Sequence, residues 1–312
     1  MIATVTLNPS LDEWVMLPRL IVRGLNRCGP ISRYAAGKGI NVSRVVRELR
    51  GRTIAFGLAG GDDGAILRRS LTRLRVPHHL VHVPGATRNN YKIITKHPRG
   101  VTEINPAGPP ASARALRQVL ADVRTLRPRP AVITLCGSLP SQAPATVYRD
   151  WVRALQRVGT PVLLDASGSA LRHGLSARPW AIKPNLEEAG EVLGRPLRRW
   201  QDRIEAVRAL RSRSIRVVML SMGREGALCS ADGLEGVWHA VAPPVRVVSA
   251  VGAGDSSVAG LLMGWLRCGD WREGFRLAMA CGTACALTPG TELCHRKDVL
   301  RLLPRVCLRK VG

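Results

Sequence analysis

Val251-Gly252-Ala253-Gly254-Asp255-Ser256-Ser257 joins an apolar run to a segment with helical patterning over about 254–266. The small residues let backbone N–H groups approach an anion closely, and the positive end of the following helix adds to the attraction. Asp255 then lies beside the bound group, where a carboxylate can accept a proton from an attacking hydroxyl. The stretch therefore indicates a phosphate site, with an ordinary turn and an Asp N-cap as the alternative.

Short β-branched runs alternate with amphipathic segments of helical length on either side of this stretch. This alternation predicts an α/β fold, with a mainly parallel central sheet covered by helices on both faces. Ligands in such folds bind beyond the carboxyl ends of the strands. The expected strands are 53–59, 131–136, 162–165, 181–183 and 217–221, and the expected helices are 41–50, 66–75, 112–126, 145–157, 187–193 and 202–213.

Two regions, about 11–35 and about 84–110, lack helical patterning and carry β-like pieces between Gly- and Pro-rich turns. Loops of this length without structure are uncommon inside a compact domain. We therefore expect the two regions to form a small β-lid, with long surface loops as the alternative. No repeat or linker interrupts the chain, so a single domain over 1–312 is expected.

The formal net charge of +25 comes almost wholly from arginine, in segments that contain few aromatic residues. A solvated face is the simplest interpretation, but the charge also attracts nucleic acid without sequence preference and suits anionic substrates. No zinc-finger, RNA-recognition or basic-zipper pattern occurs. A non-catalytic basic protein that binds nucleic acid therefore stays as an alternative from another functional class.

The remaining composition predicts a cytoplasmic protein without a membrane segment. Residues 1–7 resemble a β-strand rather than a targeting signal, and no apolar stretch approaches the roughly 20 residues that span a bilayer. The eight cysteines lack the paired spacing of a metal site, so we expect buried free thiols.

Residues 35–42 form a second Gly-rich turn that enters a helix. Gly37 and Gly39 allow close backbone approach, Lys38 supplies a point charge, and Asn41 can hydrogen-bond hydroxyl groups. The spacing is not that of a P-loop, so we expect a polyol or a phosphate here rather than a nucleotide.

Polar residues that suit a phosphorylated sugar also follow or occupy predicted strands. Asp12 follows the first strand, where a carboxylate can accept hydrogen bonds from two hydroxyls, although a turn Asp is equally consistent. On a strand, Arg88, Asn90 and Lys92 share one face. Two cations on one face suggest an anionic substrate.

Taken in order, these motifs resemble the PfkB/ribokinase family of carbohydrate kinases, and within it the sugar-phosphate branch typified by 1-phosphofructokinases and tagatose-6-phosphate kinases. The similarity extends almost from end to end. Its eight motifs are TLNPSLD (6–12), AGKGINV (36–42), TRNN (87–90), TEIN (102–105), GSLP (137–140), KPNLEE (183–188), SMGREGA (221–227) and GAGD (252–255).

The resemblance implies a three-layer ribokinase-like fold, a β-lid that often forms a homodimer contact, and ATP with Mg²⁺ as cofactors. It assigns the catalytic base to Asp255 and the anion hole to Gly252, Ala253 and Gly254. The residues that it assigns to the sugar are Asp12, Gly37, Gly39 and Asn41, and those for the substrate's own phosphate are Lys38, Arg88 and Asn90, with Lys92 as a looser candidate. The nucleotide positions are Lys183, Asn185, Ser221, Gly223 and Gly226, and the magnesium positions are Asn185 and Glu188.

The same resemblance implies transfer of the ATP γ-phosphoryl group to a phosphorylated ketohexose. Fructose 1-phosphate, converted to fructose 1,6-bisphosphate, is the expected substrate, with 6-phosphofructokinase and tagatose-6-phosphate kinase activities as alternatives. Residues 249–251 replace the Asp-Thr usual in ribokinase-like members, which disfavours free ribose, and 60–64 is shorter than the family's usual loop. Residues 290–294 resemble a tail found in PfkB-type 6-phosphofructokinases, which supports that alternative.

Overall fold

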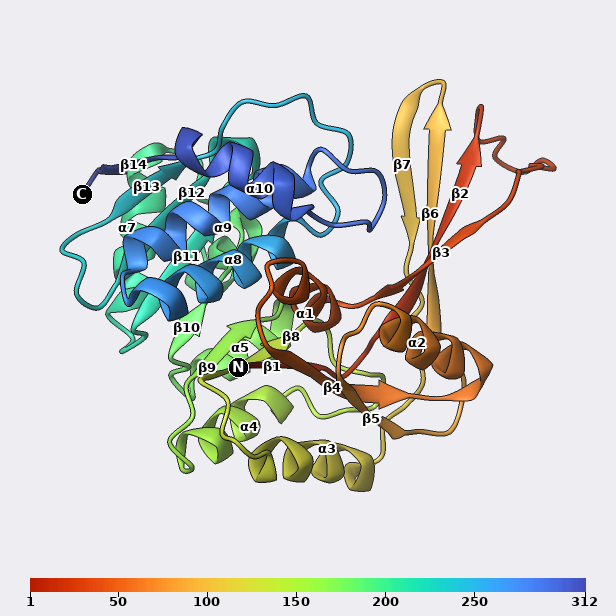
Figure 1. Ribbon diagram of the computed structural model, residues 1–312, viewed down its shortest axis with the longest axis horizontal. Coiled ribbons are helices and arrows are strands. Elements are labelled where there is room, and N and C mark those ends of the chain that lie inside the picture. Colours follow the sequence, from red (N-terminus) through yellow and green to blue (C-terminus); the bar gives the residue numbers. More distant parts are fainter.

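The computed structural model describes residues 1–312 and contains two separate β-sheets (Figure 1). The larger sheet has ten strands in the order β14-β13-β12-β11-β10-β9-β8-β1-β4-β5. In chain order these strands are β1 (Ile2–Thr6), β4 (Thr53–Ala59), β5 (His78–His82), β8 (Val132–Cys136), β9 (Val162–Asp165), β10 (Ala181–Ile182), β11 (Val217–Ser221), β12 (Ala227–Ala231), β13 (Trp238–Val241) and β14 (Cys307–Lys310).

The strands from β11 to β5 pair in parallel, whereas β12, β13 and β14 extend one edge of the sheet in antiparallel pairs. All five strands expected from the sequence are present, and 53–59, 162–165 and 217–221 match to the residue. The predicted α/β class with a mainly parallel sheet is confirmed. The parallel strands place their carboxyl ends along one edge, where ligands bind in such folds.

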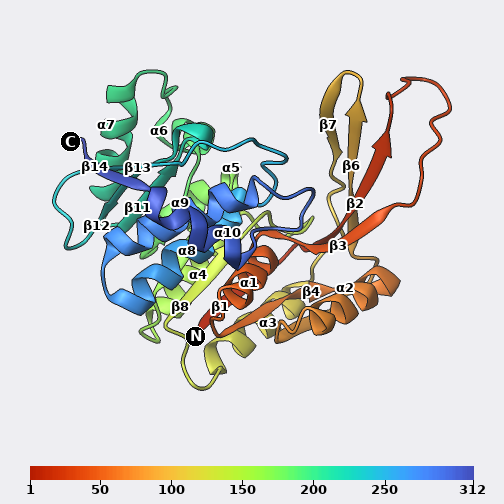
Figure 2. The same ribbon diagram turned by 45° about the horizontal axis from the view of Figure 1, so that its top comes forward.

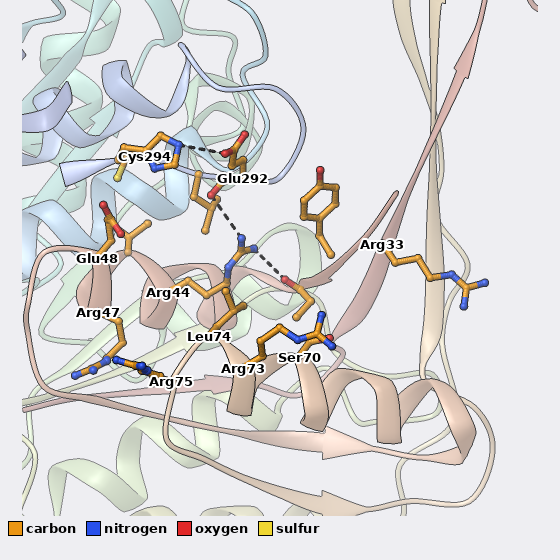
Figure 3. Close-up of a pocket in the computed structure, with 15 residues that line it drawn as sticks. Arg33, Arg44, Arg47, Glu48, Ser70, Arg73, Leu74, Arg75, Glu292 and Cys294 are labelled. Atoms are coloured by element: carbon orange, nitrogen blue, oxygen red, sulfur yellow. Dashed lines mark hydrogen bonds and ion pairs between the residues drawn. The ribbon is translucent and has the colours of Figure 1, made fainter. Parts of the chain in front are cut away.

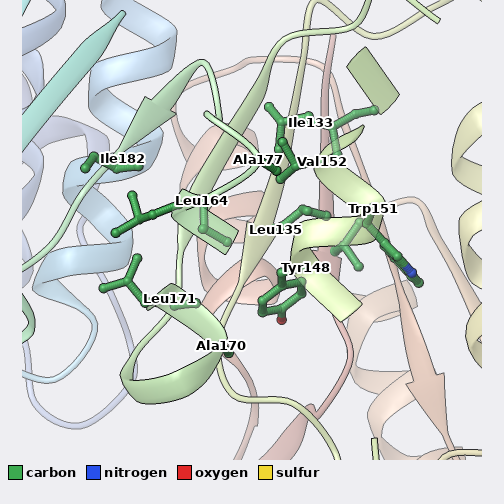
Figure 4. Close-up of a cluster of buried hydrophobic side chains, with 14 of the residues drawn as sticks. Ile133, Leu135, Tyr148, Trp151, Val152, Leu164, Ala170, Leu171, Ala177 and Ile182 are labelled. Atoms are coloured by element: carbon green, nitrogen blue, oxygen red, sulfur yellow. The ribbon is translucent and has the colours of Figure 1, made fainter. Parts of the chain in front are cut away.

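Helices cover both faces of this sheet in three layers (Figures 1 and 2). Side chains of α3, α4, α5 and α7 form one buried cluster with the sheet (Figure 4), and those of α1, α8, α9 and α10 form another on the opposite face. The helices are α1 (Lys38–Glu48), α2 (Gly61–Arg73), α3 (Ala113–Thr125), α4 (Val147–Gln156), α5 (Gly168–Leu175), α6 (Leu186–Leu193), α7 (Trp200–Arg211), α8 (Ala253–Cys268), α9 (Trp271–Cys285) and α10 (Arg296–Leu302), with short 3₁₀ turns at Gly223–Glu225 and Leu303–Arg305.

The smaller sheet, called the lid sheet below, projects from the main body in both views (Figures 1 and 2). Its order is β3-β2-β6-β7, with β2 (Ser10–Leu17), β3 (Ser32–Ala36), β6 (Arg88–Lys96) and β7 (Arg99–Ile104). All four strands come from the two regions in which we expected a lid. Within each region the two strands pair in antiparallel fashion, and parallel pairing of β2 with β6 joins the two regions into one sheet.

Two smaller expectations concern the membrane and the cysteines. None of the helices combines the length and the apolar character needed to cross a membrane.

All eight cysteines are free thiols, and five of them are buried. The expectation of burial is wrong for Cys28, Cys268 and Cys307, which are exposed.

Candidate active site

The helix α8 begins at the glycine-rich stretch, at the edge where the parallel strands end. Gly252 is its N-cap and has a left-handed backbone, with φ of 79°. A Cβ at this position would overlap the side chain of Leu293, so the turn requires glycine on both counts. Asp255 lies in the first turn of α8 and is buried. Its Oδ2 accepts a hydrogen bond of 2.8 Å from Nδ2 of Asn41 on α1.

The surroundings of Asp255 raise the pKa of its carboxyl group above the ordinary value of an aspartate. Burial, followed by repulsion from Asp165, raises the pKa of Asp255 to about 6, although Lys38, Asn41 and Lys183 act in the opposite direction. At pH 7 and above, the group is therefore mostly ionised, and it remains a stronger proton acceptor than an exposed aspartate. This is the range in which a general base works at physiological pH.

Asp165 is a site residue that our sequence analysis missed. It ends β9, is fully buried, and its Oδ1 lies 3.0 Å from Nζ of Lys38 and 3.5 Å from Nζ of Lys183. Burial acts to raise its pKa, but the two lysines hold the pKa below its ordinary value. Its Oδ2 has no hydrogen-bond partner. A carboxylate at the carboxyl end of a parallel strand was the available signal, because the edge of the sheet gathers such side chains.

The two predicted lysines therefore meet at one buried carboxylate. Lys38, from α1, also lies 3.9 Å from Oε1 of Glu188, and these neighbouring carboxylates raise its pKa against the effect of burial. Lys183 follows β10 and is buried, and its Nζ lies close to Gly254 at the start of α8. Two ammonium groups and a helix N-terminus thus converge on the same space, which favours an anion there.

Asp12, predicted to bind the sugar, and Asn90, predicted to bind the substrate's phosphate, face each other in the lid sheet. They are register partners on β2 and β6, and Nδ2 of Asn90 donates to Oδ1 of Asp12 at 3.0 Å. Asp12 is buried, and its Oδ2 accepts a weaker contact from Thr291 at 3.4 Å. Residues from three distant parts of the chain therefore present a carboxylate and an amide to one place.

The cations of β6 differ in their availability. The terminal nitrogens of Arg88 donate to the carbonyls of Asn8 and Pro106, and no carboxylate pairs with it, while its Nε is buried without a partner. Lys92 is buried and pairs with Glu103 at 3.0 Å. Arg88 therefore offers an uncompensated charge at the base of the lid sheet, whereas the charge of Lys92 is already neutralised.

The glycines of the second Gly-rich turn are required by packing. Gly37 has φ of 124°, and a Cβ there would lie 2.7 Å from Cγ2 of Thr6. A Cβ at Gly39 would lie 2.6 Å from Oγ1 of Thr6 and 2.9 Å from the carbonyl of Val5. Because of these close approaches, the N-terminus of α1 packs directly against β1. Lys38 and Asn41 therefore lie at the same edge of the sheet as Asp165 and Asp255.

A cavity of about 750 Å³ opens beside the start of α8. Four of the five predicted nucleotide positions line it together with Ala253 and Gly254, namely Asn185, Ser221, Gly223 and Gly226, whereas Lys183 does not. Its apolar wall, which the sequence did not predict, comes from the segment after β13 and from α9. The additional lining residues include Ala242, Pro243, Pro244, Val245, Val247, Met279 and Ala286.

Asn185 and Glu188 form a reciprocal cap at the start of α6. Oδ1 of Asn185 accepts from the Glu188 amide at 2.8 Å, and Oε2 of Glu188 accepts from the Asn185 amide at 2.9 Å. The capping box occupies Oδ1 of Asn185 and leaves Oε1 of Glu188 facing Lys38. No three His, Cys, Asp or Glu side chains of the chain gather as a metal site by themselves.

A phosphotransferase is the class of protein that this fold and this cluster define. Phosphoryl transfer to an alcohol depends on positioning and on neutralising charge, and a helix N-terminus beside two ammonium groups does both. Residues 5–298 match the family described as pfkB family carbohydrate kinase. The chain therefore belongs to the pfkB family of carbohydrate kinases.

Several known relatives of the chain within this family are phosphofructokinases. The chain is 35% identical to the 1-phosphofructokinase of Bacillus subtilis (strain 168) over 306 residues, which cover 98% of each chain. It is 33% identical to the 1-phosphofructokinase of Escherichia coli (strain K12) over 308 residues, covering 99% of this chain and 98% of the relative. The structure of phosphofructokinase-2 from Escherichia coli in complex with substrates and products superposes with a TM-score of 0.92, at 29% identity, and covers 97% of this chain and 98% of that one.

These matches make the protein a sugar-phosphate kinase, as the sequence motifs implied. They give no support to the alternative of a non-catalytic protein that binds nucleic acid.

Proposed function

We propose that the protein transfers the γ-phosphoryl group of ATP to fructose 1-phosphate and forms fructose 1,6-bisphosphate. The observation that carries the proposal is the buried Asp255 at the N-terminus of α8, next to Lys183 and the large cavity. The alcohol of the sugar attacks the phosphorus, the bond to the ADP oxygen breaks, and Asp255 accepts the alcohol's proton. The amides of Gly252, Ala253 and Gly254 stabilise the charge on the transferred group.

ATP fits the cavity on two grounds. Its apolar wall, from Pro243 to Val247 and from Met279, suits a flat adenine ring, and its inner end reaches Ala253 and Gly254 at the start of α8. The triphosphate then points toward Lys183 and the helix N-terminus. A volume of about 750 Å³ lies within the range of small-molecule sites.

Magnesium fits the carboxylate oxygens of the site that accept no hydrogen bond. Kinase Mg²⁺ is held by one or two carboxylates, the phosphates and water, rather than by a full protein cage. Oδ2 of Asp165 is buried without a partner. Oε1 of Glu188 faces Lys38, which also contacts the other oxygen of Asp165. We propose that these two residues hold the ion, with Asn185 fixing Glu188 through the capping box. When bound, the ion neutralises charge on the β- and γ-phosphates.

The substrate's own phosphate is proposed to bind Lys38, Arg88 and Asn90, and the sugar hydroxyls Asp12 and Asn41. The support is the uncompensated Arg88 and the pairing of Asp12 with Asn90 on the lid sheet. Fructose 1-phosphate is preferred because the Bacillus subtilis and Escherichia coli relatives are named 1-phosphofructokinases. Fructose 6-phosphate and tagatose 6-phosphate are the competing substrates, and the resemblance to phosphofructokinase-2 favours the first of these.

Phosphosugars are expected to exceed free fructose and ribose in kcat/KM by at least about tenfold, because one charge-assisted contact contributes about 1.5–3 kcal/mol. ADP release with Mg-ATP measures this for fructose 1-phosphate, fructose 6-phosphate, tagatose 6-phosphate and the two free sugars. Arg88→Met should reduce the preference, whereas Arg117→Met, on the exposed face of α3, should leave it unchanged. Equal use of fructose and its phosphates would show that no phosphate site exists.

A homodimer through the lid sheet is the assembly that we propose. Large apolar side chains are exposed on its strands and on the loop between β2 and β3, where water would otherwise cover them. They include Met16, Ile21, Val22, Leu25, Val101 and Ile104. Light scattering after size exclusion should give twice the mass of 33.8 kDa, and Val22→Asp with Leu25→Asp should return it to the monomer mass. A wild-type monomer at micromolar concentration would refute the dimer.

A further inference from the structure

A second cavity, of about 480 Å³, lies outside the residues of the proposed active site. Figure 3 shows it between α1, the end of α2, β3 and the segment 292–295. It shares no lining residue with the nucleotide cavity, and none of the proposed catalytic, sugar or metal residues lines it. Its volume lies within the range of small-molecule sites.

Arginine dominates the lining of this cavity. Arg33 is neutralised by Glu13 at 2.9 Å. The other four form no ion pair, whereas arginine takes part in seven ion pairs elsewhere in the chain. They are Arg44 and Arg47 of α1, Arg73 of α2 and Arg75 just beyond it. The cavity therefore carries more arginine charge than the two carboxylates in its lining, Glu48 and Glu292, can offset.

The two carboxylates in the lining are already used by other groups. Oε1 of Glu48 accepts from the backbone amide of Arg296 at 2.7 Å, at the start of α10. Oε1 of Glu292 lies 3.2 Å from Nε2 of His295. Neither forms an ion pair with a guanidinium of the cavity, and four unpaired arginines against two carboxylates leave an excess of positive charge for a ligand.

Arg44 lies at the centre of the cavity in Figure 3 and is the least solvated of the four. Its terminal nitrogens donate to the carbonyl of Ala35 at 3.0 Å and to the carbonyl of Glu292 at 3.5 Å. Burial lowers its pKa to about 10. A partly buried cation that donates to carbonyl oxygens and forms no ion pair gains from an anion in contact with it.

We infer that this cavity is a binding site for a small anion with at least two phosphate charges, such as a diphosphate or a bisphosphorylated metabolite. Guanidinium groups bind phosphate oxygens in bidentate pairs, and four of them around one cavity match several phosphate charges. The site would act on the enzyme through α1. Arg44 contacts Oδ1 of Asn41 at 3.5 Å, and Asn41 donates to Asp255 at 2.8 Å. This regulatory consequence rests on the proposed role of Asp255, whereas the binding itself does not.

Calorimetric titration with inorganic pyrophosphate, without Mg²⁺ and at fixed 150 mM salt, tests the site. The variant Arg47→Gln/Arg73→Gln/Arg75→Gln should raise the Kd of one bound equivalent by at least tenfold. The matched control, Arg114→Gln/Arg117→Gln/Arg124→Gln, removes the same charge from the exposed face of α3 and should change the Kd by less than twofold. All three substituted arginines of the cavity lie outside the proposed catalytic machinery, so basal ADP release should be unchanged.

Three outcomes would overturn the inference: identical isotherms for the cavity variant and the wild type, equal weakening in both triple variants, or no binding by the wild type. The first places pyrophosphate in the active site only, and the second means attraction by net charge alone. Failure of the kinase proposal would leave the titration unaffected, so the two failures are distinguishable. If the site is present, pyrophosphate should alter ADP release by the wild type and by the control, but not by the cavity variant.

Discussion

Asp255→Asn is expected to lower kcat by about 10²- to 10⁴-fold, the usual contribution of a positioned general base. The substitution keeps the shape of the side chain and an oxygen that can accept the hydrogen bond from Asn41. It removes the only proton acceptor at the start of α8, so the attacking hydroxyl keeps its proton. ATP affinity should change little, because the cavity and the α8 amides remain. Single-turnover kinetics and equilibrium ATP binding measure the two quantities separately.

Two further observations separate loss of the base from loss of the fold. Burial disfavours the ionised form of Asp255 and raises its pKa in the folded protein to about 6. The contribution of this group to the free energy of unfolding is therefore present at acid pH and is lost as pH rises through 6. Asp255→Asn should therefore be at least as stable as wild type above pH 6. In wild type, kcat/KM should fall about tenfold per pH unit below 6, as the base becomes protonated. Turnover by Asp255→Asn within tenfold of wild type would remove the base assignment.

Asp165→Ala is expected to destabilise the protein by about 3–5 kcal/mol, because removing one member of a buried ion pair leaves the other uncompensated. Lys183 is buried and has only Asp165 as an ion-pair partner, while Lys38 loses its shorter contact of 3.0 Å. For a chain of this size the loss corresponds to a decrease in Tm on the order of 10 °C. Thermal denaturation measures it, and Asp165→Asn, which keeps the volume, should lose less.

Asp232→Ala is the matched control for this prediction. Asp232 also contacts two cations, Arg211 and Arg216, but Asp232 and Arg216 are exposed to solvent and the Arg211 side chain is 25% exposed. Its removal should cost less than about 1 kcal/mol, since exposed ion pairs contribute little. Lys183→Met added to Asp165→Ala should recover part of the lost stability by removing the unpaired cation. Equal losses from Asp165→Ala and Asp232→Ala would show that the central carboxylate is not a structural anchor of the site.

The region in which strands and helices alternate could be predicted because the sequence patterns that indicate these elements are local. Five strands of the parallel region follow from β-branched runs, and the helices between them, except α5, follow from amphipathic periodicity. The helix α9 was missed because Gly274 and Gly282 disfavour helix in isolation. Tertiary packing overrides that preference: Gly260 and Gly264 of α8 approach the α9 backbone so closely that a Cβ would lie 2.5–2.6 Å from its carbonyls. A single sequence does not show that contact.

Some residues of the proposed site could likewise be predicted from local sequence motifs, whereas others depend on the tertiary structure. Asp255, Lys38 and Asn41 stand in motifs whose local chemistry is visible in the sequence, and the structure brings all three to one edge. Asp165 was missed because it occupies the last position of an ordinary buried strand, and only the sheet order places that position between Lys38 and Lys183. The neutralisation of Lys92 by Glu103 likewise depends on the pairing of β6 with β7.

The proposed reaction is tested most directly by ³¹P NMR of fructose 1-phosphate with Mg-ATP, with wild type and Asp255→Asn in parallel. We expect wild type to form ADP and fructose 1,6-bisphosphate in equal amounts, faster than it phosphorylates fructose 6-phosphate, and the variant to form neither on the same timescale. No bisphosphate from fructose 1-phosphate, under conditions where another phosphosugar is consumed, would contradict the proposed substrate. Equal rates for the two proteins would contradict the proposed mechanism.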